Sequence, residues 1–184
     1  SLVDVERYIT PNWGIGRTLR VTASRGCPHN CSFCYNQAFN RRRRRAHSAD
    51  AVVERVSAIA REHEVEGVYF NDDNFFVDAD WAWSILERLA LPYYVCVRAE
   101  RIDEAFADRL AATGCKELMI GYESGCDRVL DEVLNKGSTV ADQVNATRIM
   151  ARHPQIKIFG AFMTALPGET PPEAAMTLQL MCDY

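Results

Sequence analysis

Short apolar runs alternate with longer amphipathic segments along this chain. Runs rich in β-branched and aromatic residues predict strands at residues 18–24, 67–70, 93–97, 117–120 and 156–163. Apolar residues at helical spacing predict helices at about 48–63, from about 78, at 103–113, 127–134 and 139–153, and from 170 onward. Strand–helix units in succession predict a parallel α/β sheet with right-handed crossovers, either open or part of a barrel.

Residue types at the ends of the helical segments support these boundaries. Ser48 is expected to cap the first helix, and Gly114 to end the third. Thr170 and Glu173 have the spacing of a capping box, with proline at the first helical position. In folds of this class the functional site lies at the carboxyl ends of the strands, so the chemistry is expected in the loops that follow them.

Composition and charge are those of an ordinary globular domain. The chain has 184 residues, of which 48% are hydrophobic and 25% charged, and its formal net charge is −4. This length predicts one domain that needs no disulfide scaffold, and the mild acidity gives no general case for nucleic acid or an anionic membrane. Because no apolar stretch is long enough to span a bilayer and the N-terminus lacks signal-peptide features, we expect a cytoplasmic protein or a piece of a larger one.

Three of the seven cysteines lie directly after the first predicted strand. Cys27, Cys31 and Cys34 have the spacing C-x3-C-x2-C, which in a reducing compartment indicates metal rather than disulfides. Three thiolates can hold three irons of a 4Fe–4S cluster and leave the fourth iron open to another ligand. Zinc is the alternative, with His29 as a possible fourth ligand, but no second pair with metal-ligand spacing occurs elsewhere. The spacing therefore favours a cluster.

This cysteine motif resembles the signature of the radical S-adenosylmethionine (SAM) superfamily, in which an aromatic residue precedes the last cysteine, as Phe33 does here. The resemblance implies a partial TIM-type barrel with about five of six βα units present. Its core would occupy residues 18–184 after an N-terminal extension at 1–17, with the sixth strand beyond Tyr184. It also implies a 4Fe–4S cluster and SAM as cofactors, a one-electron reductant of the flavodoxin or ferredoxin type, and reductive cleavage of SAM to methionine and a 5′-deoxyadenosyl radical.

Polar side chains follow the second and third predicted strands. Asp72 and Asp73 lie in a run of Asn and Asp that by itself is typical of a turn and a helix cap. In the family this place holds contacts to the SAM amino group, so the resemblance makes both carboxylates candidates for that role. Arg98 leaves the third strand, where its guanidinium could pair with a carboxylate of SAM or of Glu123, or form a structural ion pair.

Segments after the fourth and fifth strands also match the family. Residues 121–125, Gly-Tyr-Glu-Ser-Gly, are similar to its Gly-x-Glu-Ser segment, which implies that Glu123 accepts hydrogen bonds from the ribose or amino group of SAM. Lys136 resembles the basic residue that meets the SAM carboxylate, although a cation near a helix C-terminus is an equal interpretation. Residues 165–170 resemble the Gly-Leu-Pro-Gly-Glu-Thr turn, with alanine for the first glycine. Met163, just before this turn, would lie near the adenine, or else in the core.

The remaining cysteines and the arginine-rich segment receive no catalytic role. Cys96, Cys115, Cys126 and Cys182 lie in predicted strands or helices, or beside them, and are interpreted as packing residues. The five consecutive arginines at 41–45 are interpreted as a solvated run, with an anionic substrate or nucleic acid as the alternative.

Within the superfamily, residues 24–28, 72–75 and 121–125 are together most similar to the branch with cobalamin-binding domains, which methylates or cyclises unactivated carbons. Cobalamin is implied by this resemblance only. A methylthiotransferase acting on RNA or protein shares the turn motifs but would need a second cluster and a nucleic-acid module. A non-catalytic iron–sulfur or zinc-binding module is the alternative from a different class. The expected partners are a reductant, an unknown substrate and further domains of the same protein, with no membrane and no nucleic acid.

Overall fold

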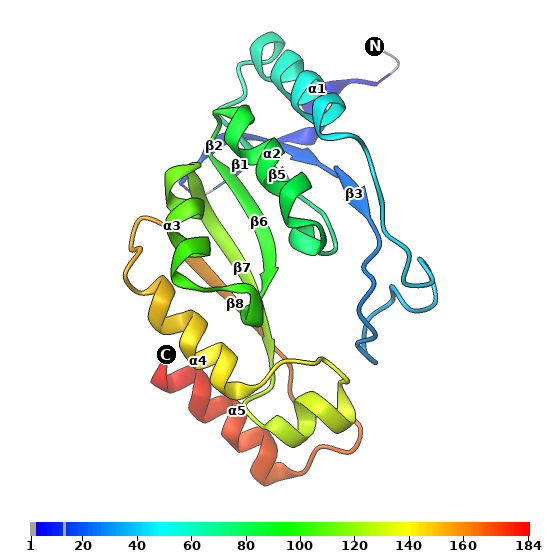
Figure 1. The fold of residues 1–184 in the computed structure, drawn as a ribbon, viewed down its shortest axis with the longest axis vertical. Coiled ribbons are helices and arrows are strands. Elements are labelled where there is room, and N and C mark those ends of the chain that lie inside the picture. Colours follow the sequence, from blue (N-terminus) through cyan, green and yellow to red (C-terminus); the bar gives the residue numbers. More distant parts are fainter. Residues whose placement is uncertain (1–2, 13) are drawn as a thin grey trace.

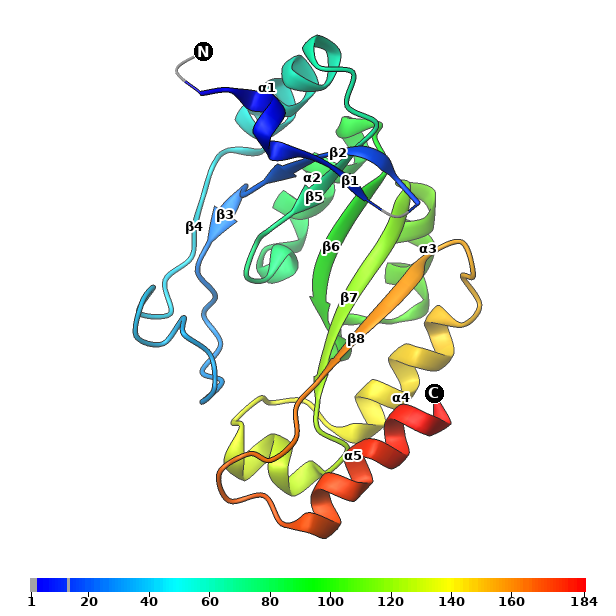
Figure 2. The same ribbon diagram turned by 180° about the vertical axis from the view of Figure 1, so that it is seen from behind.

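A curled sheet of six strands forms the centre of the computed structural model, which describes residues 3–12 and 14–184. The strand order is β1-β2-β5-β6-β7-β8, and every neighbouring pair is parallel except the antiparallel β1–β2 pair. Helices pack along one side of the sheet, which bends like part of a barrel wall (Figures 1 and 2). The predicted α/β fold, a partial TIM-type barrel, is therefore confirmed. The strands of this sheet are β1 (Ile9–Asn12), β2 (Gly16–Val21), β5 (Gly67–Phe70), β6 (Tyr93–Arg98), β7 (Cys115–Glu123) and β8 (Lys157–Phe162).

Within the described residues, five α-helices connect or follow these strands, and the N-terminal caps that the sequence predicts for α1 and α5 are present. Ser48 accepts a hydrogen bond from the backbone N–H of Ala51 at the start of α1, and the capping box of Thr170 and Glu173 is present at the start of α5. The α-helices are α1 (Ala49–Glu62), α2 (Ala79–Leu89), α3 (Glu104–Ala112), α4 (Val140–Met150) and α5 (Pro171–Asp183). Short 3-10 turns are η1 (Val5–Tyr8), η2 (Phe75–Val77) and η3 (Ala99–Arg101), and a π-helical turn is η4 (Val129–Val133).

The first predicted strand, at residues 18–24, is wrong at its C-terminal end. The sheet strand β2 ends at Val21, and Ser24 belongs instead to β3 (Ser24–Arg25), which pairs with β4 (Arg45–Ala46) in a separate two-stranded ribbon. The reason is the carboxylate of Asp72, which accepts hydrogen bonds from the backbone N–H groups of Ala23 and Ser24. These amides are therefore withdrawn from the main sheet, and the chain leaves it here.

Two further elements differ from the pattern-based prediction. No strand was predicted in the N-terminal part of the chain, yet β1 pairs with β2 at the edge of the sheet, where a proline such as Pro11 is tolerated. The predicted helix at 127–134 contains the π-helical turn η4, after which Lys136 N–H donates to the carbonyl of Leu130. Such a turn widens the helix locally and is frequent at functional sites.

Alternation along the central strands separates the core from the opposite face of the sheet. In β7, Leu118 and Ile120 are fully buried in the hydrophobic core, while Met119 and Gly121 point to the other, concave face. The same alternation in the neighbouring β6 sends Cys96 to that concave face. Among the described residues, no helix is both long and apolar enough to cross a membrane.

Candidate cofactor site

The three clustered cysteines lie in the long loop between β3 and β4. Hydrogen bonds hold this loop in place: Ser32 N–H donates to the carbonyl of Leu134 at 2.8 Å, and the Asn135 amide donates to the carbonyl of Asn30 at 3.0 Å. Within the loop, Gln37 donates to the carbonyl of Cys31 at 2.7 Å. The loop is therefore tied to the segment that follows the π-helical turn, at the carboxyl ends of the strands.

A pocket of about 150 Å³ opens between the cysteine loop and the carboxyl ends of β5, β6 and β7. Cys27 and Cys31 are buried and Cys34 is half-buried. The lining residues come from the loop, from the strand ends and from the segment after η4. They are Cys27, His29, Cys31, Phe33, Cys34, Asn36, Asp73, Asn74, Cys96, Val97, Arg98, Met119, Gly121, Glu123 and Lys136. The structure thus brings eight of the ten predicted site residues to one cavity.

Each of the three cysteine sulfurs faces one side-chain N–H donor, and each donor comes from a different segment. The donor–sulfur pairs are Asn74 Nδ2 with Cys27 at 4.0 Å, Arg98 Nη1 with Cys31 at 3.5 Å, and Asn36 Nδ2 with Cys34 at 3.5 Å. Donors of this kind stabilise negative charge on sulfur, which a metal-bound thiolate carries. Burial raises the pKa of the Cys27 thiol, so this sulfur is protonated until a metal replaces the proton.

The geometry of the donor set distinguishes a cluster from a single metal ion. Within residues 3–12 and 14–184, no three His, Cys, Asp or Glu side chains converge on a point where one ion would bind. In a 4Fe–4S cluster each cysteine binds a different iron, so its ligands need not converge on one point. His29 lines the pocket, where burial, and then the charge of Arg98, lower its pKa, but it completes no zinc site. Three sulfurs around one cavity therefore fit a cluster better than zinc.

A buried ion pair forms the wall of the pocket on the β7 side. Lys136 Nζ donates to Glu123 Oε1 at 3.1 Å, and the two side chains are 3% and 12% exposed. Glu123 lies at a bulge in β7 with φ 69°, in the left-handed region. A Cβ on Gly121 would lie 2.6 Å from Glu123 Oε1 and 3.2 Å from Lys136 Nζ, so a larger residue here would displace the ends of the paired side chains. A carboxylate and an ammonium held side by side can bind the opposite charges of an amino-acid zwitterion.

Asp73 and Arg98 also line the pocket, each already engaged by protein groups. Asp73 accepts hydrogen bonds from Gly26 N–H at 2.6 Å and from the Tyr35 hydroxyl, which raises the pKa of Tyr35 to about 12. The guanidinium of Arg98 pairs with Glu100 and donates to the carbonyl of Lys136. Of the partners considered for Arg98, the structure therefore supplies a local carboxylate rather than Glu123.

Asp72 and Met163 do not line this pocket. Asp72 is buried and accepts hydrogen bonds from Ala23 N–H at 3.1 Å and Ser24 Oγ at 2.6 Å, which gives it a structural role; burial raises its pKa against the effect of these bonds. Met163 packs beside Leu130 in a small hydrophobic cluster, and only its N–H reaches the site region, by donating to the carbonyl of Glu123. These two side chains fit the structural alternatives, a turn and the core.

Sequence reasoning missed several lining residues. Met119 supplies part of the apolar surface in the pocket, and alternation along β7 from Glu123 would have identified it. Asn36 gave no signal, because an isolated asparagine in a loop is unremarkable, and Asn74 was not singled out within the run of Asn and Asp at 71–74. The packing interpretation holds for the buried Cys115 and Cys126. It is wrong for two other cysteines, since Cys182 is exposed and Cys96 lines the pocket.

The arginine run divides into an exposed part and an engaged part. Arg41, Arg42 and Arg43 are exposed, as the solvated interpretation predicts. Arg44 stacks on Trp81, with its guanidinium carbon 4.2 Å from the ring centroid. Arg45 donates to the side chain of Asn40 at 3.0 Å. The second half of the run is therefore part of the folded loop.

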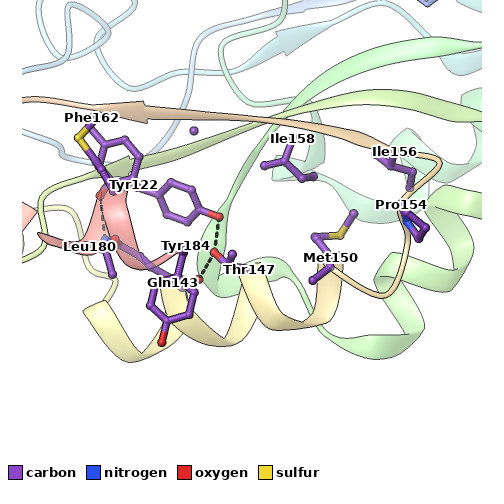
Figure 3. A pocket seen from close by; sticks show the side chains of 13 residues that line it. Tyr122, Gln143, Thr147, Met150, Pro154, Ile156, Ile158, Phe162, Leu180 and Tyr184 are labelled. Atoms are coloured by element: carbon purple, nitrogen blue, oxygen red, sulfur yellow. Dashed lines mark hydrogen bonds between the residues drawn. The ribbon is translucent and has the colours of Figure 1, made fainter. Parts of the chain in front are cut away.

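A larger cavity of about 410 Å³ lies between α4, β8 and α5, on the helical side of the sheet (Figure 3). Its wall is mainly apolar, and the Tyr122 hydroxyl within it hydrogen-bonds Thr147 Oγ1 at 2.7 Å. Among the described residues that line it, only Tyr122 and Tyr184 are titratable. Apart from these two phenol groups, the described lining holds no side chain suited to metal binding or acid–base chemistry, so the candidate site is the smaller pocket.

Comparisons with known proteins agree with this geometry. A curated relative from Pyrococcus horikoshii, "Uncharacterized methyltransferase PH0819", is 30% identical over 164 residues, which cover 86% of this chain and 35% of the relative. Another, "Putative methylthiotransferase MJ0865" from Methanocaldococcus jannaschii, is 25% identical over 91% of this chain and 40% of the relative. The chain thus spans about a third of the length of such relatives.

The fold also matches solved structures. The radical SAM methyltransferase TsrM from Kitasatospora setae, with cobalamin and a [4Fe-4S] cluster bound, superposes with a TM-score of 0.78 at 22% identity, over 89% of this chain and 32% of that one. At this identity the match concerns the fold. The model of the family described as "Radical SAM superfamily" matches residues 21–181. With nearly the whole chain matched and the three cysteines gathered around one pocket, this protein belongs to the radical SAM superfamily.

Proposed function

We propose that residues 18–184 are the core of a radical SAM methyltransferase in which Cys27, Cys31 and Cys34 hold a 4Fe–4S cluster. The superfamily uses this cluster and SAM as cofactors, and its members need a reductant and a substrate. When bound, the cluster supplies the single electron that cleaves SAM reductively. The observation that carries the proposal is the pocket itself, where three cysteine sulfurs face a buried carboxylate–ammonium pair.

The residues of the pocket divide the task of holding SAM. Glu123 and Asp73 supply carboxylates for the amino group or ribose, and Lys136 supplies a cation for the SAM carboxylate. Arg98 directs an N–H group at the Cys31 sulfur at 3.5 Å, so it would act as a hydrogen-bond donor to the sulfur ligand of the cluster. Phe33 lines the pocket and is 42% exposed, so its ring offers an aromatic surface to the cofactor at the edge of the cysteine loop.

Methyl transfer to an unactivated carbon, with cobalamin as a further cofactor, is the reaction we favour. It is supported by the relative named a methyltransferase and by the fold shared with TsrM. Cyclisation of a carbon skeleton remains within the same proposal, because the residues that hold SAM do not choose the substrate. Cobalamin and the substrate would be bound by other parts of the full-length protein.

Anaerobic reconstitution with iron, sulfide and SAM tests this proposal. We expect about four iron and four sulfide per chain, and 5′-deoxyadenosine after addition of a strong reductant. Cys31→Ala should abolish both, whereas Cys182→Ala, at an exposed cysteine remote in sequence from the cluster loop, should leave both unchanged. One zinc without sulfide, or equal turnover in Cys31→Ala, would contradict the proposal.

A methylthiotransferase is a second candidate because MJ0865, 25% identical, carries that name as a putative assignment. Such an enzyme would need a second cluster, that is, about eight iron per chain. The other four cysteines are spread over β6, β7, the segment after β7, and α5. In the part of the chain that the structure describes, they form no group of metal ligands. Iron content of the full-length protein separates the two candidates: four iron per chain supports the methyltransferase, and eight supports the methylthiotransferase.

A further inference from the structure

Behind the Cys34 sulfur lies a line of hydrogen bonds that ends in the arginine run. Asn36 donates from Nδ2 to Cys34 Sγ at 3.5 Å and accepts at Oδ1 from Asn40 Nδ2 at 2.6 Å. Asn40 in turn accepts at Oδ1 from Arg45 Nη2 at 3.0 Å. Asn36 and Asn40 are only 3% and 7% exposed, so water does not replace the bond between them.

Arg45 fixes the direction of every bond in this line. A guanidinium only donates, so Asn40 must present its carbonyl oxygen to Arg45 and its NH2 group to Asn36. Asn36 must then present its oxygen to Asn40, which leaves its NH2 group facing Cys34. Without Arg45, either amide can rotate and turn a carbonyl oxygen toward the sulfur. Arg45 thus sets the orientation of the donor at Cys34 through the two asparagines between them.

We propose that Arg45, Asn40 and Asn36 act as positioning residues that keep an N–H donor on the Cys34 sulfur and thereby raise the reduction potential of the cluster. This inference rests on the proposed function. Reduction adds one electron, supplied by the external reductant, and no bond is made or broken in the protein. The reduced cluster carries one more negative charge, so an N–H dipole directed at a ligand sulfur stabilises it more than the oxidised cluster.

Only the donor at Cys34, the side-chain amide of Asn36, depends on this line of hydrogen bonds. Asn74 and Arg98 face the other two sulfurs and contact neither Asn36 nor Asn40 by any bond described above. They remain in place when the line is cut. The expected effect is therefore a partial shift of the potential rather than loss of the cluster.

A redox titration of the reconstituted chain with dithionite, followed by the electron paramagnetic resonance signal of the reduced cluster and done without SAM, tests the inference. In Asn36→Leu, which keeps the volume but removes the donor, we expect the equilibrium constant for reduction to fall about tenfold, a potential about 59 mV more negative. An unchanged potential in an Asn36→Leu protein with full iron content would overturn the inference.

Two arginine variants separate the effect of the Asn36 amide orientation on the potential from the effect of net charge. Arg45→Met should shift the potential in the same direction by about threefold in the equilibrium constant. Arg41→Met removes the same charge from an exposed arginine that, within the described structure, bonds to no side chain, and should leave the potential unchanged. Equal shifts in both would mean that only net charge matters and would overturn the inference.

The same experiments distinguish failure of the proposed function from failure of the inference about Arg45, Asn40 and Asn36. If the wild-type chain binds no 4Fe–4S cluster, the proposed function fails, and the inference with it. If the wild-type chain binds the cluster but Asn36→Leu does not, the comparison of Arg45→Met with Arg41→Met decides, because both arginines lie on the surface. If the wild-type cluster forms and no variant shifts its potential, only the inference fails.

Discussion

Two cavities of this molecule, the cysteine pocket and the cavity between α4, β8 and α5, use opposite faces of the same strand. Tyr122 and Glu123 are neighbours in β7, yet Tyr122 lines the larger, mainly apolar cavity on the helical side, and Glu123 lines the cysteine pocket on the concave side. The larger cavity has about 410 Å³ and the smaller about 150 Å³. The candidate site is therefore identified by its position at the strand ends and by its buried charges, and not by the volume of the cavity.

The cysteine pocket contains a buried ion pair, so loss of one partner there should lower the free energy of unfolding more than a change in the apolar cavity. Lys136→Met would leave the Glu123 carboxylate buried without its cation, and we expect the free energy of unfolding to fall by about 3 kcal/mol. Urea unfolding followed by circular dichroism measures this. Glu123→Gln, which leaves Lys136 with a neutral acceptor, is the matched variant. A Lys136→Met protein as stable as wild type would show that the pair is not closed to water.

The concave side of the sheet also depends on the buried carboxylate of Asp72, which accepts hydrogen bonds from Ala23 and Ser24 where the chain leaves β2. In Asp72→Asn, one amide N–H would oppose the N–H of Ala23 or Ser24, so we expect a loss of about 2 kcal/mol in unfolding free energy and weaker iron incorporation. Asp80→Asn, at an exposed site in the first turn of α2, should change neither quantity. Normal iron content in a destabilised Asp72→Asn chain would separate these hydrogen bonds from the cluster loop.

On the helical side, a single hydrogen bond in the larger cavity should matter only for stability. Tyr122→Phe removes the bond to Thr147 and is expected to cost about 1 kcal/mol, measured by urea unfolding. Iron content and SAM binding should stay at their wild-type values. A loss of SAM affinity in this variant would break the functional separation of the two cavities.

The smallest effect is expected at the cysteines outside both cavities. Cys182 is exposed, whereas burial raises the pKa of Cys115 to about 12. Alkylation of the native chain at pH 8, followed by mass spectrometry of peptides, should therefore modify Cys182 early and Cys115 only after unfolding, with no change in the stability of the Cys182-modified chain. Early modification of Cys115 would indicate that the N-terminal end of β7 opens readily.

Much of the fold was predictable because it depends on neighbours in sequence. Ser48 and Thr170 cap helices where the pattern places them, since a capping bond spans only three residues. The strand β5 was predicted with its observed ends, because Gly67–Phe70 is a short apolar run bounded by polar residues. The division of residues 18–24 was not, because it depends on Asp72, which is far away along the chain.

The site shows the same division. The spacing of Cys27, Cys31 and Cys34 was sufficient to favour a cluster, and the resemblance to the family indicated Glu123 and Lys136, which both line the pocket. Asp72 and Asp73, however, are adjacent carboxylates with different fates: one clamps Ser24 and the other lines the pocket. No pattern distinguishes them, since their directions depend on where the β2–β3 connection passes.

The strand–helix alternation, the first and last helix caps and the cysteine spacing follow from local sequence, because each depends on residues within one turn or one loop. Long-range folding adds three features: which N–H group faces which sulfur, which carboxylate reaches the pocket, and the connection of Arg45 to Cys34 through two buried asparagines. Such contacts depend on the directions of side chains brought together by the folding of the loop and sheet. Linear spacing does not encode those directions, whereas burial makes each of them energetically consequential.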